Sequence, residues 1–207
     1  MIATKNHINK KILILDIDGV VIIGGERFSS RFSRQFNVPY SEVLKFFKNE
    51  FKGCVIGTAD LKKVIRPYLK KWGWKKSLKS LLEYWFEGES IVNWELISYV
   101  RRLRDGGTRC YIATNQERYR SDFIKNIMKL DTMFDGMFFS WEMGVKKPKA
   151  KFYKQMIKRL KIDNPKSILF WDDEKENVNS ARKLGIGAYI YRNYEQFRKK
   201  IDKIIAN

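Results

Sequence analysis

The sequence predicts an α/β fold, in which a parallel sheet has helices on both faces and a small all-helical domain is inserted after the first strand. Short aliphatic runs, typical of strands buried on both faces, occur at 11–15, 109–113, 167–171 and 188–191. Segments of helical periodicity separate the later runs, as in the strand–helix units of a parallel sheet. About 65 residues after the first strand show helical patterns and no clear strand. We therefore expect a core domain of residues 1–23 and 91–207 and a helical domain of residues 24–90.

The first predicted strand, residues 11–15, ends in two acids. Asp16 and Asp18 follow it directly, and Gly19 comes next. An unpaired buried charge is costly, and ligands of parallel α/β sheets bind at the carboxyl ends of the strands. Gly19 permits the backbone turn that brings both acids to one ligand. Taken alone, the same residues also fit a strand followed by an ordinary Asp-Gly turn.

Helical patterns fill the inserted segment. Phe28, Phe32 and Phe36 recur every four residues and predict a short helix that ends near residues 37–39. We expect Thr58 and Ser77 to cap two later helices. Four aromatic residues of this segment are candidates to face a substrate, but their helical spacing favours a place in the core: Trp72, Trp74, Trp85 and Phe86.

Strand–helix alternation resumes after residue 90. Asn93 is expected to cap a helix that ends at the glycine pair 106–107. Further helices are expected at about 118–130, 149–161 and 176–184, and a loop at 144–148. Each predicted strand from the first to the third is followed by polar residues at its carboxyl end.

The predicted sheet thus gathers carboxylates, a hydroxyl and an amide at one edge, and a nearby loop adds a lysine. The residues are Asp16 and Asp18, Thr114 and Asn115, Asp172 and Asp173, and Lys147. Each position alone has a simpler interpretation, because the strand-end residues could cap helices and the lysine could lie on the surface. Together, clustered acids repel one another unless a divalent cation neutralises them, and hard oxygen ligands favour Mg²⁺.

These motifs, in this order, resemble the haloacid dehalogenase-like hydrolase superfamily, specifically its phosphatase branch. The resemblance covers nearly the whole chain, and the helical segment is similar to the cap domain of that superfamily. It implies a Rossmann-like core with helices on both faces. Residues 113–120, Ala-Thr-Asn-Gln-Glu-Arg-Tyr-Arg, more weakly resemble bacterial sugar-phosphate phosphatases related to glucose-1-phosphate phosphatase.

The resemblance implies a role for each residue. Asp16 would be the nucleophile that forms an aspartyl-phosphate, and Asp18 the acid and base. Thr114, Asn115 and Lys147 would bind the substrate phosphoryl group. Mg²⁺ would be held by four residues, with Asp18 contributing its backbone carbonyl and Asp173 acting at longer range: Asp16, Asp18, Asp172 and Asp173.

Asp18 separates the branches of the superfamily. In its haloalkanoate dehalogenases the equivalent position is not an acid, since a halide leaves without a proton whereas an alkoxide needs one. We therefore expect a Mg²⁺-dependent phosphatase that acts on a sugar phosphate or nucleotide. A phosphomutase is an alternative, because it uses the same core residues and differs in how its cap controls water.

Composition sets the remaining expectations. The 207 residues include 42 Lys and Arg against 23 Asp and Glu, a formal net charge of +19. The basic residues are spread along the chain, which favours a solvated basic surface, but the charge keeps a nucleic-acid-binding protein on a phosphatase fold as the second alternative. No apolar run reaches the ~18 residues of a membrane span, and Cys54 and Cys110 are the only cysteines. We expect a cytoplasmic monomer or homodimer that binds a small phosphorylated metabolite and no membrane. The single histidine, His7, is expected on the surface, which leaves no His-based triad or zinc site without it.

Overall fold

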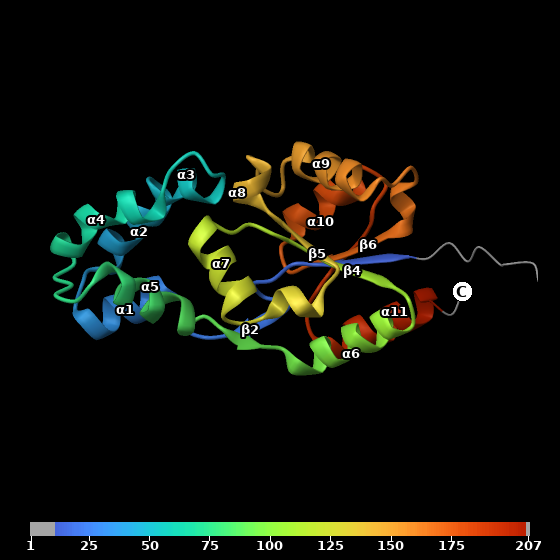
Figure 1. Cartoon of the computed structure of the whole chain (residues 1–207), viewed down its shortest axis with the longest axis horizontal. Helices are drawn as coiled ribbons and strands as arrows, with labels where there is room; N and C mark the ends of the chain where they lie inside the picture. The colour runs from blue at the N-terminus through green and yellow to red at the C-terminus, as the bar shows by residue number, and fades with distance from the viewer. Residues whose placement is uncertain (1–10, 206–207) are drawn as a thin grey trace, which may run out of the picture.

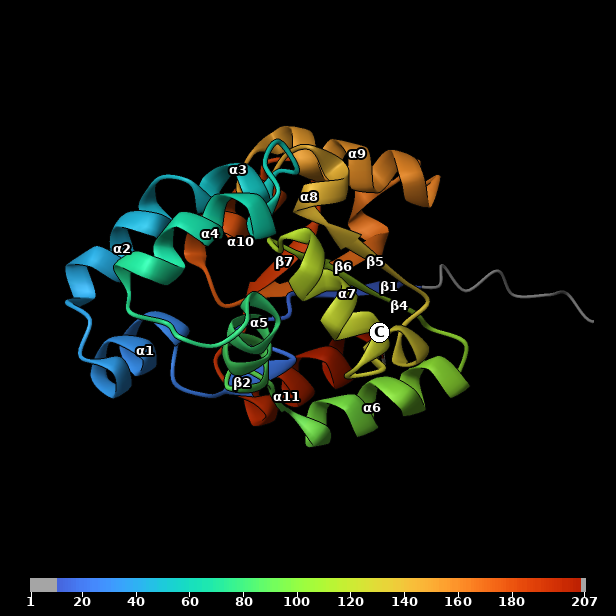
Figure 2. The same cartoon turned by 60° about the vertical axis from the view of Figure 1, so that its left-hand side comes forward.

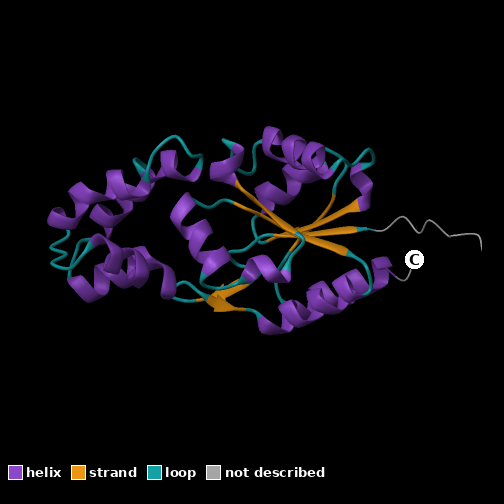
Figure 3. Cartoon of the chain, viewed as in Figure 1, coloured by secondary structure: helices purple, strands orange, loops and turns teal. Residues whose placement is uncertain are grey.

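A computed structural model describes residues 11–205, and a five-stranded parallel sheet lies at its centre (Figures 1 and 3). His7 lies outside the described residues. The spatial order of the strands is β5-β4-β1-β6-β7. Their bounds are β1 Ile12–Leu15, β4 Arg109–Thr114, β5 Gly136–Phe139, β6 Ile168–Asp172 and β7 Gly187–Ile190.

Helices cover both faces of the sheet because successive strand residues point to opposite sides. Leu13 and Leu15 pack in one core with three helices, α6 (Trp94–Asp105), α7 (Arg118–Asn126) and α11 (Tyr194–Ile205). Ile12 and Ile14 pack in a second core with α9 (Ala150–Leu160) and α10 (Lys175–Arg182). The predicted α/β class with helices on both faces is confirmed.

The strand order places a topological switch point at β1. The chain passes from β1 to β4 and β5 on one side, then returns to β6 and β7 on the other. The carboxyl ends of β1, β4 and β6 therefore meet in the middle of the sheet, where ligands of such folds bind.

Five helices follow the first strand of the sheet and precede α6: α1 Phe28–Phe36, α2 Tyr40–Lys48, α3 Phe51–Val55, α4 Leu61–Lys71 and α5 Leu78–Glu87. We call them the helical insertion. They form a group beside the sheet in two views, and they enclose a core of their own (Figures 1 and 2). The four aromatic residues considered for substrate contact are buried in this core, as their spacing predicts: Trp72, Trp74, Trp85 and Phe86.

A short antiparallel ribbon connects the helical insertion to the sheet. Its strands are β2 (Ile22–Gly24) and β3 (Ile91–Val92), with Ile22 opposite Val92. Neither strand was expected from the sequence, since each is too short to show a period. The ribbon brings both ends of the insertion to the same place, next to the end of β1.

Two of the three helix caps expected from the sequence are present in the structure. Ser77 and Asn93 accept hydrogen bonds from the backbone N–H groups three residues on and cap α5 and α6, as expected. The expectation for Thr58 is wrong, because α4 begins at Leu61 and its cap is Asp60, which accepts the N–H of Lys63 at 3.0 Å. The Thr58 hydroxyl instead lies 3.2 Å from the Gly53 carbonyl.

Other differences concern short elements. The helix expected at 118–130 ends at Asn126, and a 3₁₀ turn, η1 (Leu130–Met133), follows after a break. The short helix α8 (Ser140–Met143), the turn η2 (Pro165–Ser167) and α11 were not expected. Within residues 11–205, none of the helices combines the length and the apolar character needed to cross a membrane.

Candidate active site

The site is built on the carboxyl ends of two neighbouring strands. Leu15 of β1 lies opposite Trp171 of β6, so the next residues, Asp16 and Asp172, lie at one edge of the sheet. The Asp16 amide donates to the Trp171 carbonyl at 2.9 Å and continues the pairing by one residue. Both carboxylates are buried: Asp16 is 7% exposed and Asp172 is fully enclosed.

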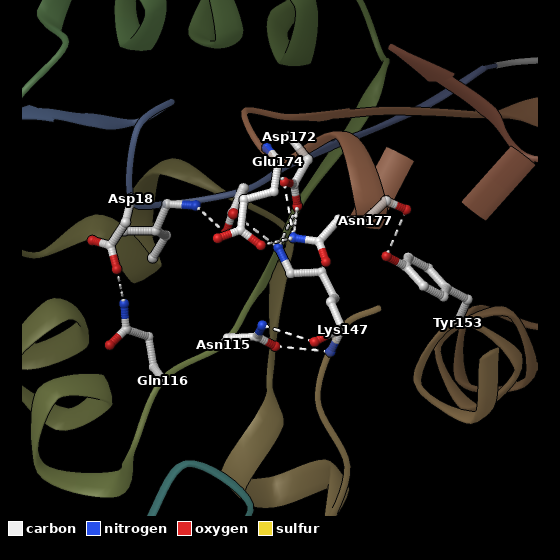
Figure 4. A network of polar contacts seen from close by, with 10 residues as sticks. Asp18, Asn115, Gln116, Lys147, Tyr153, Asp172, Glu174 and Asn177 are labelled. Carbon is white, nitrogen blue, oxygen red and sulfur yellow. Dashed lines mark hydrogen bonds and ion pairs between the residues drawn. The ribbon is translucent and has the colours of Figure 1, made fainter. Parts of the chain in front are cut away.

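Lys147 joins the two acids. Its Nζ lies 2.6 Å from Asp172 Oδ2 (Figure 4). The same Nζ lies 2.9 Å from Asp16 Oδ2, and the side chain is buried. The loop that carries it is fixed by Asn115, which accepts from the Lys147 amide at 2.9 Å and donates to the Lys147 carbonyl at 3.1 Å. Asn115 was expected to bind the substrate. Both polar groups of its side chain instead form hydrogen bonds with the backbone of Lys147.

Asp172 is held by the start of the next helix. Asn177 Nδ2 lies 3.0 and 3.1 Å from the two oxygens of Asp172, and the Glu174 amide donates to Oδ1 at 2.8 Å. Tyr153 in turn donates its hydroxyl to the Asn177 carbonyl at 2.9 Å (Figure 4). These contacts fix the Asp172 carboxylate in one orientation.

A third acid completes the cluster. Carboxylate oxygens of Asp16, Asp172 and Asp173 lie within 4.8 Å of one another, and Asp173 is exposed to solvent. Gly19 lies directly against Asp173: it has φ +79°, and a Cβ there would lie 2.3 Å from Asp173 Oδ2. The turn predicted at Gly19 is therefore present, and it needs a residue without a side chain.

Asp18 is a second exposed acid of the site. It lies two residues after Asp16, and its Oδ2 accepts a 2.6 Å hydrogen bond from Gln116 Nε2 (Figure 4). Thr114 is buried and is the last residue of β4, the strand that pairs with β1, so it lies at the same edge of the sheet. The sequence-predicted site residues therefore meet at one edge of the sheet.

Burial and mutual repulsion shift the pKa values of the charged groups. Burial raises the pKa of Asp16 well above its usual value; Lys147 opposes this shift and Asp172 adds to it. Burial lowers the pKa of Lys147, but its two carboxylate neighbours outweigh burial and raise it overall. The pKa of Asp173 is raised by burial and then by Asp172. The single positive charge of Lys147 does not neutralise the negative charges of three carboxylates.

The donor set fits a divalent cation. Three carboxylates converge, one of them open to solvent, and all are hard oxygen ligands of the kind that Mg²⁺ prefers. A cation among them would favour the ionised forms of Asp16 and Asp173, whose pKa values are otherwise raised. The residues present therefore fit the group that the sequence analysis expects.

Sequence reasoning did not assign a role to two polar residues of the site. Gln116 stands directly after Thr114 and Asn115, but only the fold brings it to Asp18. Tyr153 lies on α9, and its position in a helical apolar pattern indicates core alone, although its hydroxyl supports Asn177. No spacing signal in the sequence links Tyr153 to the site.

Solved structures share this fold over nearly their whole length. A predicted HAD-like family hydrolase from Porphyromonas gingivalis superposes with a TM-score of 0.80 and 22% identity, over 95% of this chain and 98% of that one. A HAD family enzyme from Bacteroides thetaiotaomicron, in complex with magnesium and inorganic phosphate, gives 0.74 and 21%, over 88% and 94%. These likenesses show that the chain shares the fold of both structures, the parallel sheet together with the helices that cover it.

The sequence itself shows the family. The model of the haloacid dehalogenase-like hydrolases matches residues 10–185, and the chain belongs to this family. A sesquiterpene phosphatase of Aspergillus oryzae is 30% identical over 91 residues, 44% of this chain and 46% of that one. A flavin mononucleotide hydrolase of Arabidopsis thaliana is 27% identical over 86 residues, 42% and 35%. The chain spans at most about half the length of these relatives.

Proposed function

We propose that the protein is a Mg²⁺-dependent phosphatase that hydrolyses a small phosphomonoester through an aspartyl-phosphate on Asp16. The observation that carries the proposal is the pairing of a buried acid with an exposed one: Asp16 beside Lys147, and Asp18 two residues on and open to solvent. A phosphomonoester needs a nucleophile at phosphorus and an acid for the departing alkoxide, and this pair supplies both.

The two acids divide the reaction between them. In the first half, an oxygen of Asp16 forms a bond to phosphorus while the bond to the ester oxygen breaks, and Asp18 gives its proton to the departing oxygen. In the second half, the Asp18 carboxylate takes a proton from water. The resulting hydroxide attacks phosphorus, and the bond to Asp16 breaks. Both carboxyl groups regain their starting protonation states.

Three other residues serve the phosphoryl group. Lys147 and Thr114 lie at the edge where the transferred oxygens would sit, and the lysine offsets negative charge there. Asn115 contributes to substrate binding by holding the backbone of Lys147 in place. Because these groups are pre-positioned, little reorganisation is needed as charge develops.

Four groups would hold Mg²⁺: the carboxylates of Asp16, Asp172 and Asp173 and the backbone carbonyl of Asp18. When bound, the cation would offset the charge of the acids and orient the nucleophile and the phosphoryl group. The Bacteroides thetaiotaomicron enzyme of the same fold is in complex with magnesium and inorganic phosphate, which supports this assignment.

The substrate is proposed as a small phosphorylated metabolite, a sugar phosphate or a nucleotide. We assign residues 24–90 as a cap domain that limits access to the site, and 1–23 with 91–207 as the core domain. The names of two relatives, a sesquiterpene phosphatase and a flavin mononucleotide hydrolase, support action on a small phosphate ester. The net charge of +19 would attract such anions.

Phosphate release from an aryl phosphate tests the proposal. The wild type should release phosphate with Mg²⁺ and not with chelator, and Asp16→Asn should fall to background. Asp163→Asn, an exposed acid away from the site, is the matched control and should keep wild-type activity. Release by Asp16→Asn at the wild-type rate would refute the mechanism. A wild type that moves phosphate between positions of a sugar phosphate without releasing it would be a phosphomutase.

A further inference from the structure

The carboxyl group of Asp18 is fixed by one buried amide. Gln116 is 7% exposed, and its Nε2 donates to Asp18 Oδ2 at 2.6 Å (Figure 4). An amide N–H donates and does not accept, so a proton carried by Asp18 lies on Oδ1, the oxygen that Gln116 does not contact. The hydrogen bond therefore directs the acidic proton away from Gln116.

Gln116 is itself tied to the helical insertion through a serine. Ser140, at the start of α8, is completely buried, and its Oγ lies 2.6 Å from the Val55 carbonyl and 3.1 Å from the Gln116 carbonyl. Val55 is the last residue of α3. One hydroxyl proton is thus shared between the insertion and the segment that positions Asp18.

The backbone of the insertion packs closely on α8 at the same place. A Cβ at Gly57 would lie 2.4 Å from the Trp141 carbonyl, so only glycine allows this approach. The Ser140 bridge consequently depends on the insertion being seated on α8. If the insertion moved away, the Ser140 hydroxyl would lose its shorter partner, and its one proton would be left to the Gln116 carbonyl alone.

We propose that Gln116 is the positioning residue of the proton donor Asp18, and that Ser140 links this positioning to the seated helical insertion. The inference rests on the proposed function, since it assigns a proton-donating role to Asp18. Its consequence is selective. In the first half of the reaction, which kcat/KM reports, a substrate whose leaving group needs a proton depends on Gln116, whereas one with an acidic leaving group does not. The second half, in which Asp18 takes a proton from water, is the same for both substrates.

The test compares two substrates in wild type and variants: glycerol phosphate, with an alkoxide leaving group, and 4-nitrophenyl phosphate, with an acidic phenol. Gln116→Leu should lower kcat/KM for glycerol phosphate about 10- to 100-fold and for the aryl ester less than about 3-fold. Gln116→Asn, whose amide is one methylene shorter, should show the same selectivity. Asp18→Asn removes the proton donor itself, so its effect on the two kcat/KM values gives the largest selective loss that the Gln116 variants can approach.

The serine link has its own variant and control. Ser140→Ala should lower kcat/KM for glycerol phosphate about 3- to 10-fold more than for the aryl ester. Ser121→Ala removes an equally buried hydroxyl, which donates to the Glu117 carbonyl at 2.7 Å. This variant should change the ratio of the kcat/KM values for the two substrates less than about 2-fold.

The outcomes separate the two proposals. Equal losses on both substrates in Gln116→Leu and Gln116→Asn, or no loss on either, would overturn the role of Gln116 while the selective loss in Asp18→Asn upholds the phosphatase mechanism. An unchanged substrate ratio in Ser140→Ala would overturn the link to the insertion. A wild type that hydrolyses neither ester with Mg²⁺ would overturn the proposed function and this inference with it.

Discussion

The ammonium group of Lys147 lies 2.6 Å from the carboxylate of Asp172, and neither side chain is exposed to solvent. An ion pair enclosed in this way is held by its geometry, because each charge would be strongly disfavoured without the other. Asp16 lies 2.9 Å from the same ammonium group, so one lysine neutralises part of two acids. This shared pairing gives Lys147 a structural role in addition to the one that we propose for it at the phosphoryl group.

Replacement of Lys147 should therefore reduce stability and activity together. Lys147→Met leaves Asp16 and Asp172 without their cation, and breaking such a buried pair costs about 3–5 kcal/mol. Urea unfolding in chelator measures this loss, and phosphate release should fall to background. Lys149→Met, an exposed lysine two residues on, should change the free energy of unfolding by less than about 0.5 kcal/mol. A Lys147→Met protein as stable as the wild type would contradict this account.

Magnesium should stabilise the folded protein. A ligand that binds only the folded state adds about 2.7 kcal/mol at 100 times its Kd, so Mg²⁺ should raise the thermal midpoint above that in chelator. Asp173→Asn removes one carboxylate of the cluster and should weaken Mg²⁺ binding about 10-fold or more. Asp163→Asn should bind as the wild type does. Identical midpoints with Mg²⁺ and with chelator would argue against a cation site.

The positions of the site residues at the strand ends could be predicted from the sequence. Asp16, Thr114 and Asp172 each follow a short aliphatic run, and parallel strands place their carboxyl ends at one edge, so the meeting of these residues is predictable. Gly19 was predictable too, because an acid followed by glycine indicates a turn. Local pattern and strand direction determine these features.

Contacts between distant segments were beyond such reasoning. The β2–β3 ribbon pairs residues about 70 positions apart, and neither strand is long enough to show alternation. The hydroxyl of Thr58 could cap a helix, but Asp60, two residues later, offers a competing cap, and α4 begins after Asp60. The Gln116–Asp18 hydrogen bond depends on the path of the loop after β4, which no periodicity encodes.

Glu117 should make stability depend on pH. Its carboxylate caps α7 by accepting the Tyr119 and Arg120 amides, and burial raises its pKa to about 7 from a usual 4.5. Between these values the folded state binds more protons than the unfolded state, so stability falls as pH rises and the full penalty is present above about pH 7.

Glu117→Gln removes this titration. Its free energy of unfolding, relative to wild type, should rise by about 3 kcal/mol from pH 4.5 to pH 7.5. Urea unfolding across this range measures the difference. Glu95 is an exposed acid in the first turn of α6, and the free energy of unfolding of Glu95→Gln relative to wild type should not change with pH. If the difference between Glu117→Gln and wild type did not change with pH, the Glu117 carboxyl would have the same pKa in the folded and unfolded states.

Arg120 should hold the connection between the helical insertion and the sheet. This buried side chain of α7 donates to the Phe86 carbonyl at 2.6 Å, to Ser90 Oγ at 2.9 Å and to the Glu89 carbonyl. Arg120→Met would remove these donors. The Phe86 carbonyl would keep the Glu89 amide and the Ser90 hydroxyl, so the loss falls on the Glu89 carbonyl, and an unsatisfied buried group costs about 1–3 kcal/mol.

We therefore expect Arg120→Met to lose about 1–3 kcal/mol of unfolding free energy and to be cleaved faster by protease within residues 86–93. Arg101→Met, an exposed arginine of α6, should match the wild type in both measurements. Cleavage mapped by mass spectrometry distinguishes local from global opening. A variant that loses stability but is cleaved uniformly along the chain would show that Arg120 supports the fold as a whole rather than this connection. Faster cleavage confined to 86–93 is the expected result, because the guanidinium is the group that joins α7 to the end of α5.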